Sequence, residues 1–347
     1  MDWSLDRHLR RRMAVTVLAL AALTLAFATG VAAVLAWGLE WLSRLFSLGV
    51  PFELRFALGG VVTLLGSVVM LWQALRTDAV ETFDAVAVGS EAYPGLYATV
   101  TRLAQAADLP VPSVHVTDRE RPLAMTTGLS TSDTKLVVST GLLDVLDANE
   151  LEAVIAHEIA HIKNRDATVM TLAEFPLASA RSLGRTLQHS GGVHIALVAV
   201  ALASYAFWGI GRLLVAALSR SRELAADRGA SALVGDPAAL ASALETLDSD
   251  VPSAPDRDAR EAALVSLSIV PDEQETPWPK LTYRDGWPIF WSYRLPVRRA
   301  CRRLNEQHFR PILATHPATN ERIDCLKSLE REHTTGTTGS ETGLKHC

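Results

Sequence analysis

A long apolar stretch near the N-terminus constrains this chain more than any other feature. From Met13 to Leu39 there is no charged side chain, and the first charge is Glu40. A helix of this length can cross the roughly 30 Å hydrocarbon core of a bilayer, and it is too long for the core of a signal peptide. We therefore expect a retained transmembrane helix. The composition agrees, because 49% of the residues are hydrophobic and the mean hydropathy is +0.18.

Further apolar runs predict a multi-pass protein of the cell membrane. Four arginines precede the first span and place the N-terminus in the cytoplasm by the positive-inside tendency. A second span is predicted from about Phe56 to Leu75, and a third apolar run lies from Val193 to about Gly211. The run before it, Ala167 to Leu183, contains charged residues, so an amphipathic or interfacial helix is an equal alternative there. The sequence leaves three or four spans open.

The motif H-E-x-x-H, at His157, Glu158 and His161, interrupts the apolar run A-V-I-A-H-E-I-A-H-I. Residues four apart lie on one face of a helix. Two imidazoles so placed can bind one zinc ion, and the glutamate can act as general base toward metal-bound water. Asp147 is a plausible N-cap, with Glu150 three residues later as in a capping box. The pattern predicts a zinc hydrolase.

A hydrolytic zinc site needs a third protein ligand, and the best candidate is Glu223. It lies in S-R-S-R-E-L-A-A-D, a predicted helix whose alanines permit close approach. Asp227 points the same way and is predicted to hold the second nitrogen of one ligating histidine. The alternative is that both acids pair with nearby arginines on a solvated helix. Because Glu223 must lie on the same side of the membrane as His157, an even number of crossings must separate them.

Other residues limit the possible chemistry. The net charge of −5 argues against nucleic-acid binding. Cys301, Cys325 and Cys347 are scattered, which predicts no disulfide framework and leaves zinc ligation to histidine and glutamate. His316 can donate a hydrogen bond to an oxyanion. A helix-entry role ahead of Pro317 is the stronger interpretation from the sequence alone.

Three segments resemble the HtpX-like family of membrane zinc metallopeptidases, whose wider group includes the CAAX prenyl proteases. They are Gly141 to Asp166, Ser219 to Arg228 and Thr315 to Ile323. The resemblance implies a membrane-integrated endopeptidase facing the cytoplasm, with one zinc ion per chain. It also implies that the substrates are membrane or misfolded proteins, cleaved in quality control. It assigns His157, His161 and Glu223 as ligands and Glu158 as catalytic base, and it strengthens His316 as a contact to substrate or oxyanion.

Two segments depart from the family. The strand before the zinc helix usually carries an N-A-F-type stretch, but here it is L-A-M-T-T-G, Leu123 to Gly128. Contacts between this strand and a peptide are therefore left open, although an edge strand can pair with an extended substrate. Asp250 to Trp291 matches no family pattern and is expected to be an irregular loop or lid.

The expected fold is mainly α with a small β-sheet, in which a zincin-type (gluzincin) metalloprotease domain in the cytoplasm is attached to membrane hairpins. The predicted division is a transmembrane hairpin (1–78), a first catalytic part with the zinc helix (79–166), a second membrane hairpin (167–217), a second catalytic part (218–332) and a disordered tail (333–347).

One alternative function is a non-catalytic zinc-containing adaptor or sensor, which the intact Glu158 disfavours. A metal transporter is disfavoured because the two N-terminal spans lack ionisable residues. The oligomeric state stays open.

Overall fold

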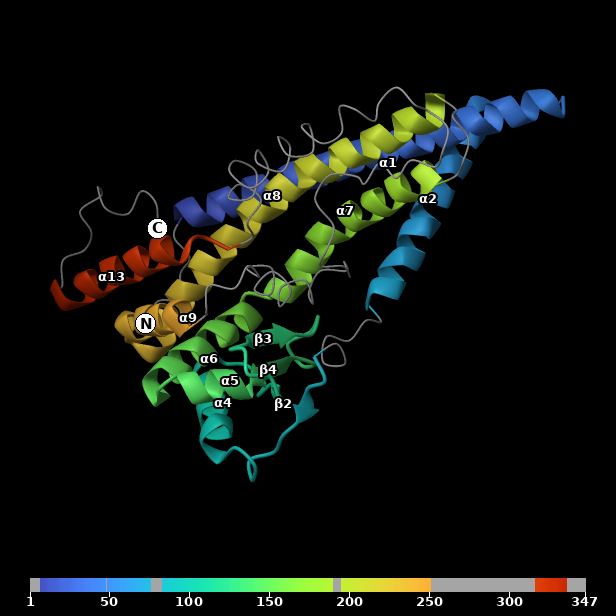
Figure 1. Ribbon diagram of the computed structural model, residues 1–347. Coiled ribbons are helices and arrows are strands. Elements are labelled where there is room, and N and C mark those ends of the chain that lie inside the picture. Colours follow the sequence, from blue (N-terminus) through green and yellow to red (C-terminus); the bar gives the residue numbers. More distant parts are fainter. Residues whose placement is uncertain (1–6, 48, 76–82, 190–194, 251–315, 336–347) are drawn as a thin grey trace, which may run out of the picture.

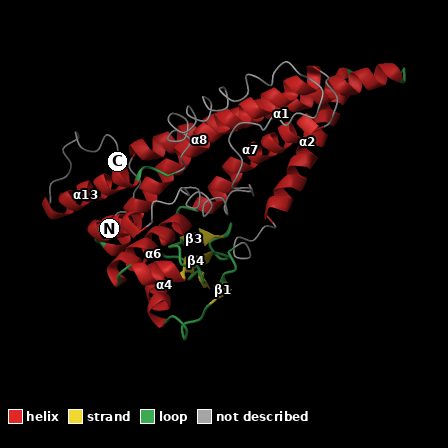
Figure 2. Ribbon diagram, viewed as in Figure 1, coloured by secondary structure: helices red, strands yellow, loops and turns green. Residues whose placement is uncertain are grey.

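The computed structural model describes residues 7–47, 49–75, 83–189, 195–250 and 316–335. This part of the chain is mainly helical with one small mixed sheet (Figure 2), which confirms the expected fold class at that level. The helices are α1 (Arg7–Leu45), α2 (Phe52–Leu75), α4 (Pro94–Ala106), α5 (Thr140–Val145), α6 (Ala148–Lys163), α7 (Asp166–His189), α8 (Ile195–Val234), α9 (Pro237–Asp250) and α13 (Thr319–Thr335). The strands are β1 (Val86–Ala87), β2 (Ser113–Thr117), β3 (Ala124–Thr127) and β4 (Lys135–Ser139).

The long helices α1, α7 and α8 lie alongside one another, and the sheet with its covering helices lies at one end of them (Figure 1). Buried apolar side chains from all three helices form their common core, including Leu20, Leu177 and Val215. The ring of Phe27 in α1 stacks on the ring of Phe207 in α8, with centroids 4.3 Å apart. The apolar faces of these helices therefore hold them together as one layer.

Three of the described helices are long and apolar enough to cross a membrane. The candidate spans are Leu9–Leu45 in α1, Phe52–Val69 in α2 and Val198–Val234 in α8. Their apolar side chains are largely exposed on the protein, as expected for surfaces that contact lipid. The predicted first and second spans therefore coincide with α1 and α2.

The run from Ala167 to Leu183, which the sequence left undecided, is the body of α7. This helix is not among the candidate spans. It carries Glu174, whose Oε1 lies 3.4 Å from an Arg212 nitrogen on α8. Because α7 and α8 pack together in a hairpin (Figure 1), the chain leaves the zinc-motif end along α7 and returns to it along α8. Glu223 of α8 thus lies at the same end of this hairpin as His157, and the number of membrane crossings between the two residues stays a prediction.

The sheet has the strand order β1-β2-β4-β3. β2 and β4 are parallel, whereas β3 runs antiparallel to β4 with Ala124 opposite Val138 and Thr127 opposite Lys135. The sequence predicts strands at Val114 to Val116, Leu123 to Leu129 and Lys135 to Ser139, and all three are present with end shifts of at most two residues. Gly128 has φ 120° and ends β3 at the predicted turn, a conformation that favours glycine. This order leaves β3 at an edge of the sheet, next to α6.

The zinc-motif helix α6 is fixed at its start by the predicted capping box. Asp147 accepts hydrogen bonds from the backbone of Asn149 and Glu150, and Glu150 Oε2 accepts one from the Asp147 backbone at 3.2 Å. The other oxygen of Glu150 accepts hydrogen bonds from Ser242 at 2.6 Å and Thr246 at 2.8 Å, both on α9. One carboxylate therefore caps α6 and ties it to a helix that is far away in the sequence.

Several expectations need correction. The sequence separated an apolar run from a helix beginning at Leu218, but α8 is one unbroken helix through both, and the boundary at 217/218 falls inside it. No glycine or proline interrupts the chain between Arg212 and Arg228, so nothing ends the helix there. The sequence predicted no disulfide framework, but Cys325 is disulfide-bonded. The tail predicted to be disordered from His333 is helical as far as Thr335.

Other predictions lie outside the described residues. These are the irregular region Asp250 to Trp291, beyond its first residue, the helix predicted from Leu295 to Phe309, and the tail after Thr335.

Replacing Glu150 with alanine is expected to lower the free energy of unfolding by about 2 kcal/mol, because it removes a cap and leaves two hydroxyls without their acceptor. Thermal unfolding in detergent, followed by circular dichroism, measures this. Glu152→Ala is the matched control. Glu152 pairs with the half-exposed Arg102, so its loss is expected to cost less than about 1 kcal/mol. Equal destabilisation by the two substitutions would contradict the anchoring role of Glu150.

Candidate metal centre

Two helices and the segment before a third bring the predicted site residues together. α6 contributes His157, Glu158 and His161, α8 contributes Glu223, and His316 lies just before α13. The side chains of Glu223 and His157 are 7% and 10% exposed. α8 packs against α6, and Ala225 and Ala226, which follow Glu223 on α8, are buried. Glu223 therefore lies beside both imidazoles, in the protein interior.

The potential ligand atoms form a compact triangle. The Nε2 atoms of His157 and His161 are 3.0 Å apart. Glu223 places Oε2 at 3.6 Å from His157 Nε2 and Oε1 at 3.7 Å from His161 Nε2. One ligand atom from each residue can be chosen so that all three lie within 4.8 Å of one another. Two imidazole nitrogens and a carboxylate oxygen are the donors that zinc accepts in hydrolytic sites.

Asp227 lies where the sequence predicted a partner for one histidine. Its Oδ1 is 3.0 Å from Nδ1 of His157, so the carboxylate fixes the orientation of the ring and directs Nε2 toward the triangle. Arg322 of α13 donates to both oxygens of Asp227, through Nε at 2.9 Å and through a terminal nitrogen at 2.6 Å. This forked pair holds the charged partner of His157 in place.

His161 has a corresponding partner in Asp166, which the sequence analysis did not identify. Nδ1 of His161 is in hydrogen-bond contact with Asp166 Oδ2, and the other Asp166 oxygen pairs with Arg222 of α8. Asp166 is the first residue of α7, five positions after His161, so the break between α6 and α7 returns its side chain to the ligand face. The sequence did contain a signal for this role, because Asp166 is an acidic residue only five positions after His161 and just beyond the predicted end of the helix.

The alternative of a solvated helix with arginine-paired acids is excluded by burial. Counted over the whole residue, Glu223 and Asp227 are 5% and 2% exposed. The neighbouring Arg222 pairs with Asp166 on another helix rather than with either acid. The arginine that contacts the two acids is the distant Arg322, whose nearest nitrogen is 3.5 Å from Glu223 Oε2.

The pKa values of the two imidazoles are shifted in opposite directions. Burial lowers the pKa of His157, but the adjacent carboxylates of Asp227 and Glu223 outweigh it and raise the pKa to about 9. Burial and the nearby positive His157 lower the pKa of His161 to about 4. The pair thus shares a single proton at neutral pH. A metal ion requires both imidazoles to be neutral, so it has to displace the proton from His157.

Glu158 and His316 lie at the edge of this triangle. Glu158 is 8% exposed and is close enough to His161 and Arg322 to act on their charges. No side chain in the described ranges donates a hydrogen bond to its carboxylate, so the oxygens are available to a proton. Nδ1 of His316 is 3.3 Å from Glu223 Oε2, and its side chain is 33% exposed. His316 therefore contacts the third potential ligand and also reaches solvent.

Most of the chain is similar in sequence to one family of peptidases. Residues 92–330 match the sequence profile described as Peptidase family M48. The "Protease HtpX homolog" of Moorella thermoacetica is 34% identical over 69% of this chain and 73% of its own length. "Protease HtpX homolog 2" of Methanosarcina acetivorans is 31% identical over 95% of this chain and 98% of its own length. "Protease HtpX homolog 1" of Streptomyces coelicolor is 36% identical over 74% and 81%, respectively.

Among solved structures, the crystal structure of S. mikatae Ste24p is similar with a TM-score of 0.41 and 17% identity, over 84% of this chain and 66% of that one. This likeness is too distant to add to the argument. The profile match over most of the chain and the identity to the curated relatives are sufficient. They show that the chain belongs to peptidase family M48, as an HtpX-type protease.

Proposed function

We propose that the chain is a zinc-dependent endopeptidase that holds one zinc ion between His157, His161 and Glu223. Zinc–ligand bonds of about 2.0–2.1 Å in a tetrahedral arrangement place the ligand atoms roughly 3.3 Å apart. The two imidazole nitrogens are 3.0 Å apart, and each lies 3.6 or 3.7 Å from a different oxygen of Glu223, so these separations are close to that value. This agreement is the single observation that carries the proposal. The donor set, two histidines and a glutamate, is of the gluzincin type.

The side chains around the ligands have distinct tasks in peptide hydrolysis. A bound zinc ion supplies a Lewis acid and lowers the pKa of water. Glu158, with no hydrogen-bond donor from described side chains, accepts the proton of the attacking water and delivers it to the leaving amine. His316 and the guanidinium of Arg322 are positioned to stabilise negative charge that develops on the substrate oxygen. Asp227 and Asp166 keep the two ligand rings oriented throughout.

The edge strand β3 supplies a binding surface for an extended peptide. Its partner on one side is β4, whereas its other edge pairs with no strand among the residues that the structure describes. β3 also packs against α6, which carries the two histidines. A peptide that adds to this edge is bound through its backbone, so β3 suits cleavage of unfolded segments of many sequences.

The substrates that fit this arrangement are membrane or misfolded polypeptides. Arg12, at the start of the first span, lies close enough to Arg220 of α8 to act on its charge. Glu223 follows Arg220 by three residues, about 5 Å along the helix. The site therefore lies close to the level of the basic end of the span, which the positive-inside tendency assigns to the cytoplasm. Quality control at the cytoplasmic face of the cell membrane is the function that this placement supports.

A non-catalytic adaptor or sensor is the less favoured alternative. A zinc site that only supports folding has all four positions filled by the protein. Here the described residues offer three ligands and an unpaired glutamate beside them.

Glu158→Gln is expected to reduce cleavage of casein or of an unfolded membrane substrate by about 100-fold or more, because the general base is lost. The bound zinc content is expected to remain at one ion per chain, since Glu158 is not a ligand. Glu152→Gln, on the same helix, is the control and should retain activity. Full activity of the Glu158 variant would refute the assigned base.

Glu223→Ala is expected to remove most of the bound zinc along with peptidase activity, since two imidazoles remain from the three ligands. Elemental analysis of the purified protein measures the zinc, and circular dichroism checks that the helices remain. Glu245→Ala, an exposed glutamate on α9, is the control and should keep both. Unchanged zinc content in the Glu223 variant would show that the metal is held elsewhere.

The proposed orientation is testable with single cysteines in a chain whose three native cysteines are replaced. Ser47, between the first two spans, and Ser132, in the loop between β3 and β4, are both exposed. In intact cells a membrane-impermeant maleimide is expected to label Ser47→Cys. Ser132→Cys should react only after the membrane is permeabilised. The reverse pattern would place the peptidase site outside the cell.

A further inference from the structure

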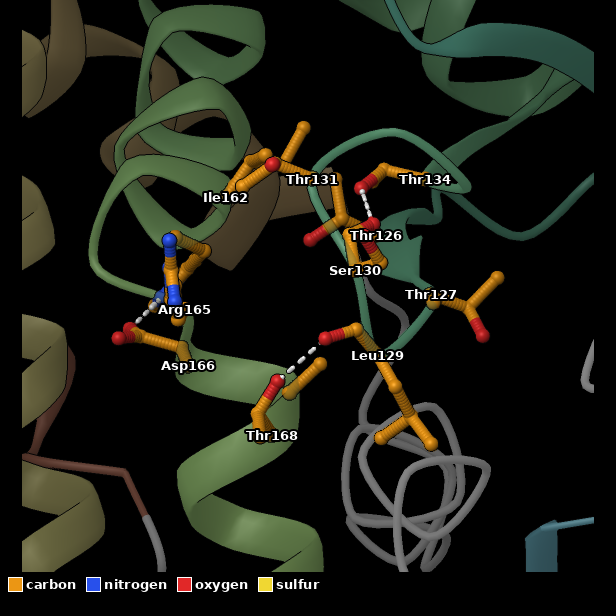
Figure 3. A pocket seen from close by; sticks show the side chains of 13 residues that line it. Thr126, Thr127, Leu129, Ser130, Thr131, Thr134, Ile162, Arg165, Asp166 and Thr168 are labelled. Atoms are coloured by element: carbon orange, nitrogen blue, oxygen red, sulfur yellow. Dashed lines mark hydrogen bonds and ion pairs between the residues drawn. The ribbon is translucent and has the colours of Figure 1, made fainter.

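A small hollow opens beside the metal centre, and the proposed mechanism assigns no task to most of its lining (Figure 3). Its walls come from β3 and the following turn, from the end of α6 and from the first turn of α7. His161 belongs to the lining, and so do Thr126 and Thr127 of the edge strand. A peptide paired with β3 would therefore place a side chain at this hollow, close to the bond being cleaved.

Arg165 lines the hollow with an unusual backbone conformation. Its φ is 56°, in the left-handed region that glycine or asparagine usually occupies after a helix. An arginine there is less stable than a glycine, because its Cβ approaches the backbone. Residues held in such conformations are concentrated at functional sites. The exposed side chain of Arg165 lies at the rim of the hollow, between α6 and α7 (Figure 3).

The guanidinium of Arg165 has no ion-pair or hydrogen-bond partner within the described ranges of the chain. The one carboxylate in the lining, Asp166, is already engaged by His161 and Arg222. The opposite wall is held in place by hydroxyl groups. Thr168 Oγ1 donates to the Leu129 carbonyl at 2.7 Å. The hollow is therefore a preformed polar site with a positive charge that no described side chain neutralises.

We propose that Arg165 determines specificity by binding the carboxylate of an aspartate or glutamate side chain in the substrate, at one fixed position next to the scissile bond. A planar guanidinium can bind a carboxylate through two parallel hydrogen bonds. This inference rests on the proposed peptidase function and adds the substrate class. Segments carrying an acidic residue at that position are cleaved in preference to others.

The first experiment identifies the position. Casein is digested with the zinc-loaded full-length protein in detergent, and the cleavage sites are determined by mass spectrometry. Aspartate and glutamate are expected to be enriched at one position flanking the cleaved bonds. Two peptides are then made that differ only by glutamate or glutamine at that position. The glutamate peptide is expected to have the higher kcat/KM by about tenfold, with the advantage reduced at high salt because the hollow is open to solvent.

The second experiment uses Arg165→Gly, which removes the guanidinium and also relieves the left-handed backbone. This variant is expected to unfold at the same or a higher temperature than the parent and to lose the preference for glutamate over glutamine. Loss of preference therefore cannot be attributed to misfolding. Arg165→Glu should reverse the preference toward a lysine peptide. Arg102→Gln is the control, since Arg102 lies on α4 and pairs with Glu152, and it should keep the parental ratio and activity.

The outcomes separate this inference from the function on which it rests. If the parent cleaves casein but shows no acidic enrichment, or if Arg165→Gly keeps the glutamate preference, the role of Arg165 is overturned and the peptidase function stands. If the zinc-loaded parent cleaves nothing, the proposed function fails and this inference fails with it.

Discussion

The structure depends on keeping two imidazoles and a carboxylate, from two different helices, within 4.8 Å of one another in the interior. Buried polar groups are costly unless each one is paired. The chain meets this requirement with an outer ring of charges, in which Asp227 and Asp166 hold the two rings and Arg322 and Arg222 hold the two aspartates. Because the ring is built from α7, α8 and α13 and holds two histidines of α6, the site forms only when all four helices are assembled.

The rest of the fold supports that assembly at three points. The capping box fixes the start of α6, and the hydrogen bonds of Glu150 to α9 fix its distance from the second half of the chain. The sheet gives α6 a rigid surface to pack against, and Ile155 and Ile159 of α6 are fully buried in the core that α6 shares with the sheet, α4 and α9. The α7–α8 hairpin, whose polar contacts include Glu174 with Arg212 and Asp166 with Arg222, returns the carboxylate of Glu223 to the histidines.

Sequence reasoning succeeded where the signal was local. The H-E-x-x-H spacing and the capping box each depend on residues a few positions apart, and the structure brings the predicted Glu223 and Asp227 to the motif. It missed Asp166 and Arg322, because their roles depend on a turn between two helices and on contact with a helix almost a hundred residues away from Asp227. It missed β1 because two exposed residues give no periodicity. It divided α8 because an apolar run followed by a charged one resembles a membrane boundary, although the backbone continues unchanged.

The continuity of α8 has a mechanical consequence. The helix is roughly 60 Å long, so it is longer than the bilayer core is thick, and its lipid-facing half and Glu223 belong to the same rod. Transmembrane helices adjust their tilt to the thickness of the surrounding lipid. Because α8 has no break between these two parts, a change in its tilt also moves the carboxylate of Glu223. The thickness of the surrounding bilayer would thereby influence where Glu223 lies relative to His157 and His161.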